Sequence, residues 1–133
     1  MNYHLDTNTC IYALKQSHPR LAERLLAAPP SDMCISAMVK AELYYGAHRS
    51  ERREKVLASL VPFLAPLRVV PFGDAEALAL AEIRAALESR GQPIGCADMV
   101  IAATALAHGA VLVTANTREF HRVTGLRVED WTK

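Results

Sequence analysis

Three carboxylates stand in apolar surroundings beside predicted secondary-structure elements. Asp6 follows a short apolar segment, Glu42 lies among apolar residues, and Asp98 begins the most apolar helical segment of the chain. An unpaired buried carboxylate costs several kcal/mol or shifts its pKa, so each position needs a compensating partner. Taken singly, Asp6 and Asp98 could cap helices and Glu42 could form a salt bridge. All three are predicted near one edge of a sheet, and this convergence favours a functional site.

Carboxylates that converge repel one another unless a cation joins them. Carboxylate and water oxygens suit Mg²⁺ or Mn²⁺, which prefer octahedral oxygen coordination. Such an ion can polarise a phosphoryl group and lower the pKa of a bound water. The three acids therefore predict a divalent-metal site that hydrolyses a phosphodiester by in-line attack of metal-bound hydroxide.

Other catalytic patterns are not apparent in the sequence. The histidines stand far apart and outside any motif, and we expect them at the surface or at helix ends: His4, His18, His48, His108 and His121. No glycine-rich phosphate loop is present. Cys10, Cys34 and Cys96 are widely spaced, odd in number and without zinc-ligand spacing, so we expect three core thiols in a reducing compartment.

Short strands alternating with helices must position the acids. Apolar runs, some rich in valine, predict strands at 3–5, 33–35, 67–71, 111–114 and 126–128. Apolar positions at helical spacing predict helices at 7–14, 21–28, 37–45, 51–65, 75–90 and 97–108. The predicted helix caps are Asp6, Ser36 and Asp74, and the predicted helix ends are Gly46, Gly91 and Gly109.

This alternation indicates an α/β fold with a mainly parallel sheet of four or five strands and helices on both faces. Right-handed crossovers gather the strand C-termini along one edge, where sheets of this kind bind their ligands. The chain of 133 residues is expected to form a single domain, residues 1–133.

The composition narrows the classes of protein. Apolar residues make up 51% of the chain, yet no apolar run reaches the roughly 18 residues of a membrane span. The N-terminus does not resemble a signal peptide, so we expect a cytoplasmic protein without membrane contact. The net charge of +1 gives no overall basic field. Cations cluster at 49–55 and 118–127; because Glu51 and Glu54 interrupt the first cluster, a solvated helix face with salt links is expected there.

Four sequence motifs, in order along the chain, resemble those of PIN domains. They are LDTN at 5–8, AELYYGA at 41–47, IGCADMVIAA at 94–103 and LVTANTREF at 112–120. The closing segment GLRVEDW at 125–131 is similar to the tail of VapC-type toxins. The resemblance covers nearly the whole chain.

The resemblance implies a three-layer α/β/α sandwich and an endoribonuclease that depends on Mg²⁺, or on Mn²⁺ as a substitute. It implies that Asp6, Glu42 and Asp98 form the acidic core, with Asp6 and Asp98 holding the metal. It also implies a structured RNA substrate, with transfer RNA suggested, a VapB-like antitoxin that blocks the active site, and a toxin homodimer.

One position departs from the family pattern, because many PIN domains have a fourth acid where this chain has Asn116. Glu119, one helical turn away, is expected to supply the missing charge, or alternatively to pair with an arginine. Thr114, Asn116 and Glu119 can face the metal from one turn, and Asn8 of the first motif is a further supporting residue. Arg118 and Arg122 are candidate RNA contacts.

Apolar residues of the early helices offer a candidate surface for the antitoxin. Ile11, Leu14, Leu25 and Leu60 could form an exposed groove for a helix, although ordinary core packing is the alternative for each. An antitoxin arginine could then pair with the acid cluster and displace the metal.

Two rival functions remain open. A PIN-like domain that binds RNA or a partner without cutting is one alternative, and it predicts the loss of an acid that is in fact present. A phosphatase or receiver domain would use Asp6 as a phosphate acceptor. The phosphatase pattern has a second aspartate where Asn8 stands, and the receiver pattern has paired acids and a lysine that this chain lacks.

Overall fold

Five parallel strands form one sheet in the computed structural model, which describes residues 2–133. The strands are β1 (Tyr3–Leu5), β2 (Met33–Ser36), β3 (Arg68–Val70), β4 (Val111–Val113) and β5 (Arg127–Glu129). Their order across the sheet is β3-β2-β1-β4-β5, and every neighbouring pair is parallel. The predicted parallel sheet is confirmed, with β1 at its centre.

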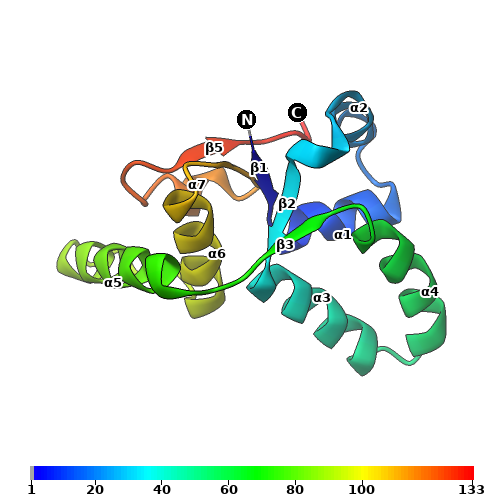
Figure 1. The fold of residues 1–133 in the computed structure, drawn as a ribbon, viewed down its shortest axis with the longest axis horizontal. Helices are drawn as coiled ribbons and strands as arrows, with labels where there is room; N and C mark the ends of the chain where they lie inside the picture. The colour runs from blue at the N-terminus through cyan, green and yellow to red at the C-terminus, as the bar shows by residue number, and fades with distance from the viewer. Residues whose placement is uncertain (1) are drawn as a thin grey trace.

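Helices cover the sheet on both sides. They are α1 (Thr7–Lys15), α2 (Pro19–Ala27), the 3₁₀ turn η1 (Pro30–Asp32), α3 (Ala37–Arg49), α4 (Arg53–Leu64), α5 (Asp74–Ser89), α6 (Cys96–Ala107) and α7 (Thr117–Phe120). Figure 1 shows α5 and α6 to the left of the sheet and α1, α3 and α4 to its right. This is the expected three-layer arrangement. Within residues 2–133, no helix is both long and apolar enough to cross a bilayer.

Side-chain caps explain where two helices beside the site begin. The Asp6 carboxylate accepts a hydrogen bond from the Thr9 amide at 2.8 Å, and the Ser36 hydroxyl accepts one from the Val39 amide at 3.1 Å. Each cap satisfies an amide that the first turn of a helix leaves without a backbone partner. Both predicted caps are confirmed, and they start α1 and α3 directly at the ends of β1 and β2.

Some predicted boundaries are wrong. Helix α3 continues through Gly46 to Arg49, because Leu43 and Ala47 on either side of the glycine are buried in the core. The N-cap of α5 is Gly73 rather than Asp74, since the Glu76 carboxylate accepts a hydrogen bond from the Gly73 amide at 2.8 Å.

The core lies between the sheet and the two helix layers. Leu5 and Leu112 on the central strands are fully buried, as are Ile101 of α6 and Phe120 of α7. The expectation of three core thiols is wrong for Cys96, which is exposed at the start of α6; Cys10 and Cys34 are buried.

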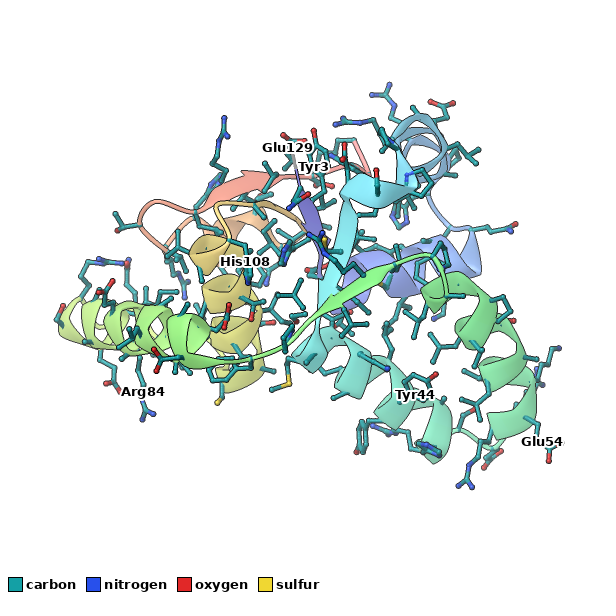
Figure 2. All side chains as sticks on the ribbon, viewed as in Figure 1. Tyr3, Tyr44, Glu54, Arg84, His108 and Glu129 are labelled. Atoms are coloured by element: carbon teal, nitrogen blue, oxygen red, sulfur yellow. The ribbon has the colours of Figure 1, made fainter. Side chains whose placement is uncertain are left out.

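The expectation of surface or helix-end histidines is wrong for His4, which is only 1% exposed on β1. Both faces of a central parallel strand are covered, so the residue between two core positions is buried as well. Neither ring nitrogen of His4 has a hydrogen-bond partner among the described residues. The ring lies 6.0 Å from that of His108, which Figure 2 shows between α6 and the sheet. His108 in turn contacts the Glu76 carboxylate at 2.7 Å.

Replacing His4 by Leu is expected to stabilise the protein and to weaken its acid sensitivity. Burial, and then His108 and Arg68, lower the pKa of His4 from 6.5 to about 4. The unfolded chain therefore takes up a proton below pH 6.5 that the folded chain rejects, so the free energy of unfolding falls as the pH falls. Between pH 7 and pH 5 the wild type should lose about 2 kcal/mol from this group, and the variant should not.

Urea unfolding at the two pH values measures this difference. Leu is close to His in volume and has no polar atom to leave unsatisfied, so the variant should also be more stable at pH 7 by about 1 kcal/mol. A difference in the free energy of unfolding between variant and wild type that is the same at both pH values would contradict the assignment.

Candidate active site

Asp6 lies at the carboxyl end of the central strand and is held there by its neighbours. Its side chain is buried and accepts a hydrogen bond from the Thr9 amide. Burial raises the pKa of the Asp6 carboxyl, and the nearby Glu42 carboxylate adds to the rise, while the nearby Thr114 and Thr9 hydroxyls and the Thr9 amide oppose it. The Asp6 side chain is therefore fixed in position and close to a second acid.

Glu42 comes from the second turn of α3, which Ser36 starts at the end of β2. Its Oε1 accepts a hydrogen bond from the Thr7 hydroxyl at 2.5 Å, and its side chain is half-buried. Thr7 is the first residue of α1 and follows Asp6 directly. One short segment at the end of β1 therefore supplies one acid and orients another.

Asp98 lies in the first turn of α6, and the other acids lie near it. Burial raises the pKa of Asp98 to about 6, and the carboxylates of Glu119, Glu42 and Asp6 contribute to the rise in that order. A carboxyl group responds in this way only to charges that are close by. The three predicted acids and Glu119 thus share one site at the carboxyl edge of the sheet.

Glu119 lies on α7, which follows β4, and it contacts Asn116. The Asn116 amide nitrogen donates to Glu119 Oε2 at 2.6 Å, and the Asn116 backbone amide donates to the Thr114 hydroxyl at 2.9 Å. No ion pair of Glu119 with an arginine is found among residues 2–133. The alternative of an arginine partner is therefore wrong, and the 114–119 turn presents Glu119 to Asp98.

The donor set suits a hard divalent cation. It consists of carboxylates, and within residues 2–133 no lysine, arginine or histidine forms an ion pair with any of the four acids. Across the same residues, no three His, Cys, Asp or Glu side chains already stand close enough to hold one ion together. The acids are thus close enough to repel one another, but no three of them already surround a common position. A bound divalent cation would relieve this repulsion.

Three other residues predicted for the site are exposed or take part in contacts with other segments. Asn8 is exposed in the first turn of α1, and Arg118 is exposed on α7. Arg122 donates to the Pro93 carbonyl oxygen at 3.2 Å and its own carbonyl accepts from Arg90 at 2.6 Å, so it ties the segment before α6 to the segment after α7.

The sequence analysis missed two threonines that hold the site together. Thr7 donates to Glu42, and the Thr9 hydroxyl donates to the Val113 carbonyl oxygen at 3.1 Å, which links α1 to β4. Thr9 could have been found from its place three residues after the capping Asp6. Thr7 could not, because its partner is 35 residues away in the chain.

A groove of about 550 Å³ adjoins the site between α1, α3 and α4. Its walls include Ile11, Leu14, Leu43, Val56 and Leu60, with Lys15, Arg52 and Lys55 also lining it and Glu42 among its residues. Of the four apolar residues expected at this surface, Ile11, Leu14 and Leu60 line the groove, although Leu60 is only 1% exposed because α4 packs on α1 and α3. Leu25 lies away from the groove and packs against the core, which is the alternative for each of them.

The comparisons with known proteins agree with this geometry. The model of the PIN domain family matches residues 3–126. The chain is 40% identical to the tRNA(fMet)-specific endonuclease VapC of Shigella flexneri over 99% of both chains. It is 39% identical to the ribonuclease VapC2 of Haemophilus influenzae over 98% of both chains.

Solved structures of VapBC complexes have the same fold. The DNA-bound VapBC of Salmonella typhimurium matches with a TM-score of 0.93 at 40% identity, covering 98% of each chain. VapBC2 of Rickettsia felis bound to a promoter DNA fragment matches with a TM-score of 0.92 at 35% identity, covering 98% of this chain and 99% of that one. The family model, the sequence relatives and the solved structures all match this chain over nearly its whole length. The chain therefore belongs to the PIN-domain family, among the VapC-type ribonuclease toxins.

Proposed function

We propose that this protein is an endoribonuclease that depends on Mg²⁺, with Mn²⁺ as a substitute, and acts as the toxin of a toxin–antitoxin pair. The proposal is supported by one observation at the carboxyl edge of the sheet. Burial raises the pKa of both Asp6 and Asp98. The carboxylates of Glu119, Glu42 and Asp6 raise the pKa of Asp98 further, and Glu42 does the same for Asp6. Such an arrangement is costly for stability and is typical of a site that binds a cation.

Asp6 and Asp98 are proposed to hold the cation, with Glu42 completing or orienting the site and Glu119 adding charge. When bound, the cation supplies positive charge that polarises the phosphodiester and favours attack by water. The chain itself positions the ligands. Thr9 fixes Asp6 and Thr7 fixes Glu42, so both carboxylates are held before substrate arrives, as precise positioning requires.

The proposed substrate is transfer RNA. Support comes from the Shigella flexneri relative, whose name gives tRNA(fMet) as its substrate and which aligns with this chain from end to end. Arg118 is an exposed cation on the same turn as Glu119 and is proposed to contact an RNA phosphate. Arg122 is a weaker candidate because its guanidinium already donates to a carbonyl.

The groove beside the site is proposed to hold a helix of a VapB-like antitoxin. Its apolar walls suit the apolar face of an amphipathic helix, and its lysine and arginine residues suit acidic side chains of the partner. Glu42 at the groove suits an incoming arginine, which would then neutralise the acid cluster. VapBC complexes among the matching structures support such a partner. A homodimer and a cytoplasmic location complete the proposal.

Incubation of the purified protein with total small RNA tests the proposed function. With Mg²⁺ or Mn²⁺ we expect cuts at defined positions, found by mapping the new 5′ ends, and with a chelator we expect none. Binding of RNA without cutting under either condition would instead support the inactive PIN-like alternative.

Replacing Leu14 by Glu is expected to weaken antitoxin binding while leaving RNA cleavage intact. The new carboxylate would lie in an apolar groove wall and would have to be desolvated when the helix docks, at a cost of several kcal/mol. Toxicity should therefore persist when the antitoxin is co-expressed. Leu26→Glu is the matched control, because Leu26 is 88% exposed and lies outside the groove. Equal silencing of both variants would contradict the assignment of the groove.

Replacing Glu119 by Gln is expected to raise the Mg²⁺ concentration for half-maximal cleavage by about tenfold, the effect typical of a group just outside the metal ligands. Loss of the Glu119 charge should also lower the pKa of Asp98 towards its ordinary value, since Glu119 makes the largest contribution among the charged groups that raise it. Adding Asn116→Asp should restore much of the Mg²⁺ affinity. An unchanged Mg²⁺ dependence in Glu119→Gln would exclude Glu119 from the site.

A further inference from the structure

The solvent-facing side of α3 carries tyrosines interleaved with cations. This surface, here called the α3 tyrosine face, consists of Lys40, Tyr44, Tyr45, His48 and Arg49. Tyr45 is 64% exposed, so its ring contributes little to the packing of this chain. Figure 2 shows Tyr44 on α3, on the other side of the sheet from α5, where Arg84 is labelled. An exposed aromatic ring of this kind is available to a ligand.

Each tyrosine of the α3 tyrosine face lies beside a cation. The Arg49 guanidinium carbon is 5.7 Å from the centroid of the Tyr45 ring, and the Lys40 ammonium is 6.0 Å from the centroid of the Tyr44 ring. Within residues 2–133, neither cation forms an ion pair with a carboxylate. Positive charge on this face is therefore not neutralised by the protein itself.

The cations at 49–55, which continue this surface to the start of α4, also form no ion pairs within residues 2–133. The sequence predicted salt links of Glu51 and Glu54 with the arginines around them, and none is found in the described part of the chain. Instead, the Arg53 guanidinium donates to the His48 carbonyl oxygen at 2.9 Å. The predicted salt links are wrong, and the cations of this cluster are not held in ion pairs by the two glutamates among them.

The α3 tyrosine face is continuous with the acidic site. Glu42, Tyr45 and Arg49 stand at positions i, i+3 and i+7 of one helix, which places them along a single stripe of its surface. Arg49 is about 10 Å from Glu42 along the helix axis. The groove is lined by Glu42, Leu43, Gly46 and Ala47 of α3, so Glu42 lies where the groove and this stripe meet. Tyr45 and Arg49 are not among the residues that line the groove, so a ligand on them approaches the acids from outside it.

We propose that the α3 tyrosine face binds unpaired nucleotides of the RNA next to the bond that is cut. Tyr45 would stack on a base, and Arg49 would contact a neighbouring phosphate. Aromatic rings accept any base whose faces are free, and cations along them follow the backbone, which is how single-stranded segments are bound. A base inside a duplex is already stacked, so this face selects looped over paired RNA. The inference rests on the proposed ribonuclease function.

Binding of a fluorescein-labelled RNA stem-loop, measured by anisotropy with Mg²⁺ present, tests the inference. The measurement uses full-length protein carrying Asp98→Asn so that the RNA stays intact. Adding Tyr45→Ala should weaken binding at least about fivefold, the lower end of the effect of removing a stacking ring. Tyr45→Phe, which keeps the ring, should bind as the parent does. Binding of a blunt RNA duplex should change little in either variant.

The salt dependence separates the role of the cation from that of the ring. Arg49→Gln should lower the slope of log Kd against log salt by about 0.7, as expected for one phosphate contact to a single strand. Arg84→Gln is the matched control, because Arg84 is an exposed arginine on α5 that pairs with Glu88. This control should leave both the affinity and the slope unchanged.

Unchanged stem-loop affinity in Tyr45→Ala, with a normal melting curve, would overturn the inference. It would also be overturned if Tyr45→Ala turned a dimer into a monomer in light scattering without changing the affinity of each protomer, because the face would then join two copies. Either of these two results would leave the proposed ribonuclease function intact, provided that the wild type cuts RNA. Absence of any cutting by the wild type would overturn the proposed function instead.

Discussion

Asp98→Asn is expected to reduce RNA cleavage by roughly a thousandfold or more, and Asp6→Asn to do the same, while both variants stay folded. Each substitution removes a carboxylate proposed to hold the cation, and with it several kcal/mol of charge stabilisation in the transition state. Asparagine keeps nearly the same shape, so packing around α6 and β1 is retained. Growth arrest by the expressed protein should disappear together with cleavage.

The control for this prediction is Glu23→Gln, which neutralises an exposed acid on α2 outside the site. It should cut RNA as the wild type does. Cleavage at the wild-type rate by Asp98→Asn in Mg²⁺, by a sample with a normal melting curve, would show that Asp98 does not belong to the catalytic machinery.

The second large effect concerns the stability of the metal-free protein, which Asp98→Asn should increase at neutral pH. Burial and three neighbouring carboxylates raise the pKa of Asp98 from 3.8 to about 6. The folded chain therefore holds this proton more tightly than the unfolded chain does, so the free energy of unfolding falls as the pH rises from about 4 to about 6. Removing the charge should restore about 1–2 kcal/mol at pH 7, after allowance for solvent screening of this half-buried group.

Thermal unfolding in a chelator at pH 7 and pH 4 measures this effect. The variant should melt several degrees above the wild type at pH 7, and the difference should largely vanish at pH 4, where Asp98 is protonated in the folded state and only partly ionised in the unfolded state. Mg²⁺ at a hundredfold excess over its Kd should stabilise the wild type by about 2.7 kcal/mol and the variant by much less. A melting temperature that ignores Mg²⁺, Mn²⁺ and chelator alike would count against a metal site.

The arrangement of the sheet could be predicted because its determinants are local. Asp6 and Ser36 combine an oxygen that caps a helix with a preceding apolar run, so each marks both the end of a strand and the start of a helix. Once these junctions are known, right-handed crossovers bring the acids that follow them to one edge. The convergence of Asp6 and Glu42 follows from this topology, and Asp98 joins them because α6, which precedes β4, begins at the same edge.

The features that the sequence analysis missed depend on contacts between distant segments. A glycine inside a helix costs only about 1 kcal/mol relative to alanine, and the buried Leu43 and Ala47 offset that cost, so α3 passes through Gly46. His4 and Leu60 are buried because β1 is covered on both faces and α4 packs on two other helices. None of these contacts can be predicted from the residues that neighbour each position in the sequence.

The fourth acid shows the same limit within the site. Glu119 lies one turn from the expected position, and the sequence leaves open whether it supplies the missing charge or pairs with an arginine. Within residues 2–133 Glu119 forms no ion pair with an arginine, and its carboxylate instead accepts a hydrogen bond from the Asn116 side chain. That bond depends on the tight turn after β4, in which the Thr114 hydroxyl accepts from the Asn116 amide.

An anomalous-difference map from crystals soaked in Mn²⁺ would test most directly whether the acid cluster is a metal site. We expect a strong peak within ligand distance of the Asp6 and Asp98 carboxylates, with Glu42 and Glu119 around it, and we expect no such peak in crystals of Asp98→Asn. A saturating soak of the wild type that leaves this position without a peak, or that places Mn²⁺ only elsewhere on the molecule, would contradict a metal-dependent active site at the end of β1.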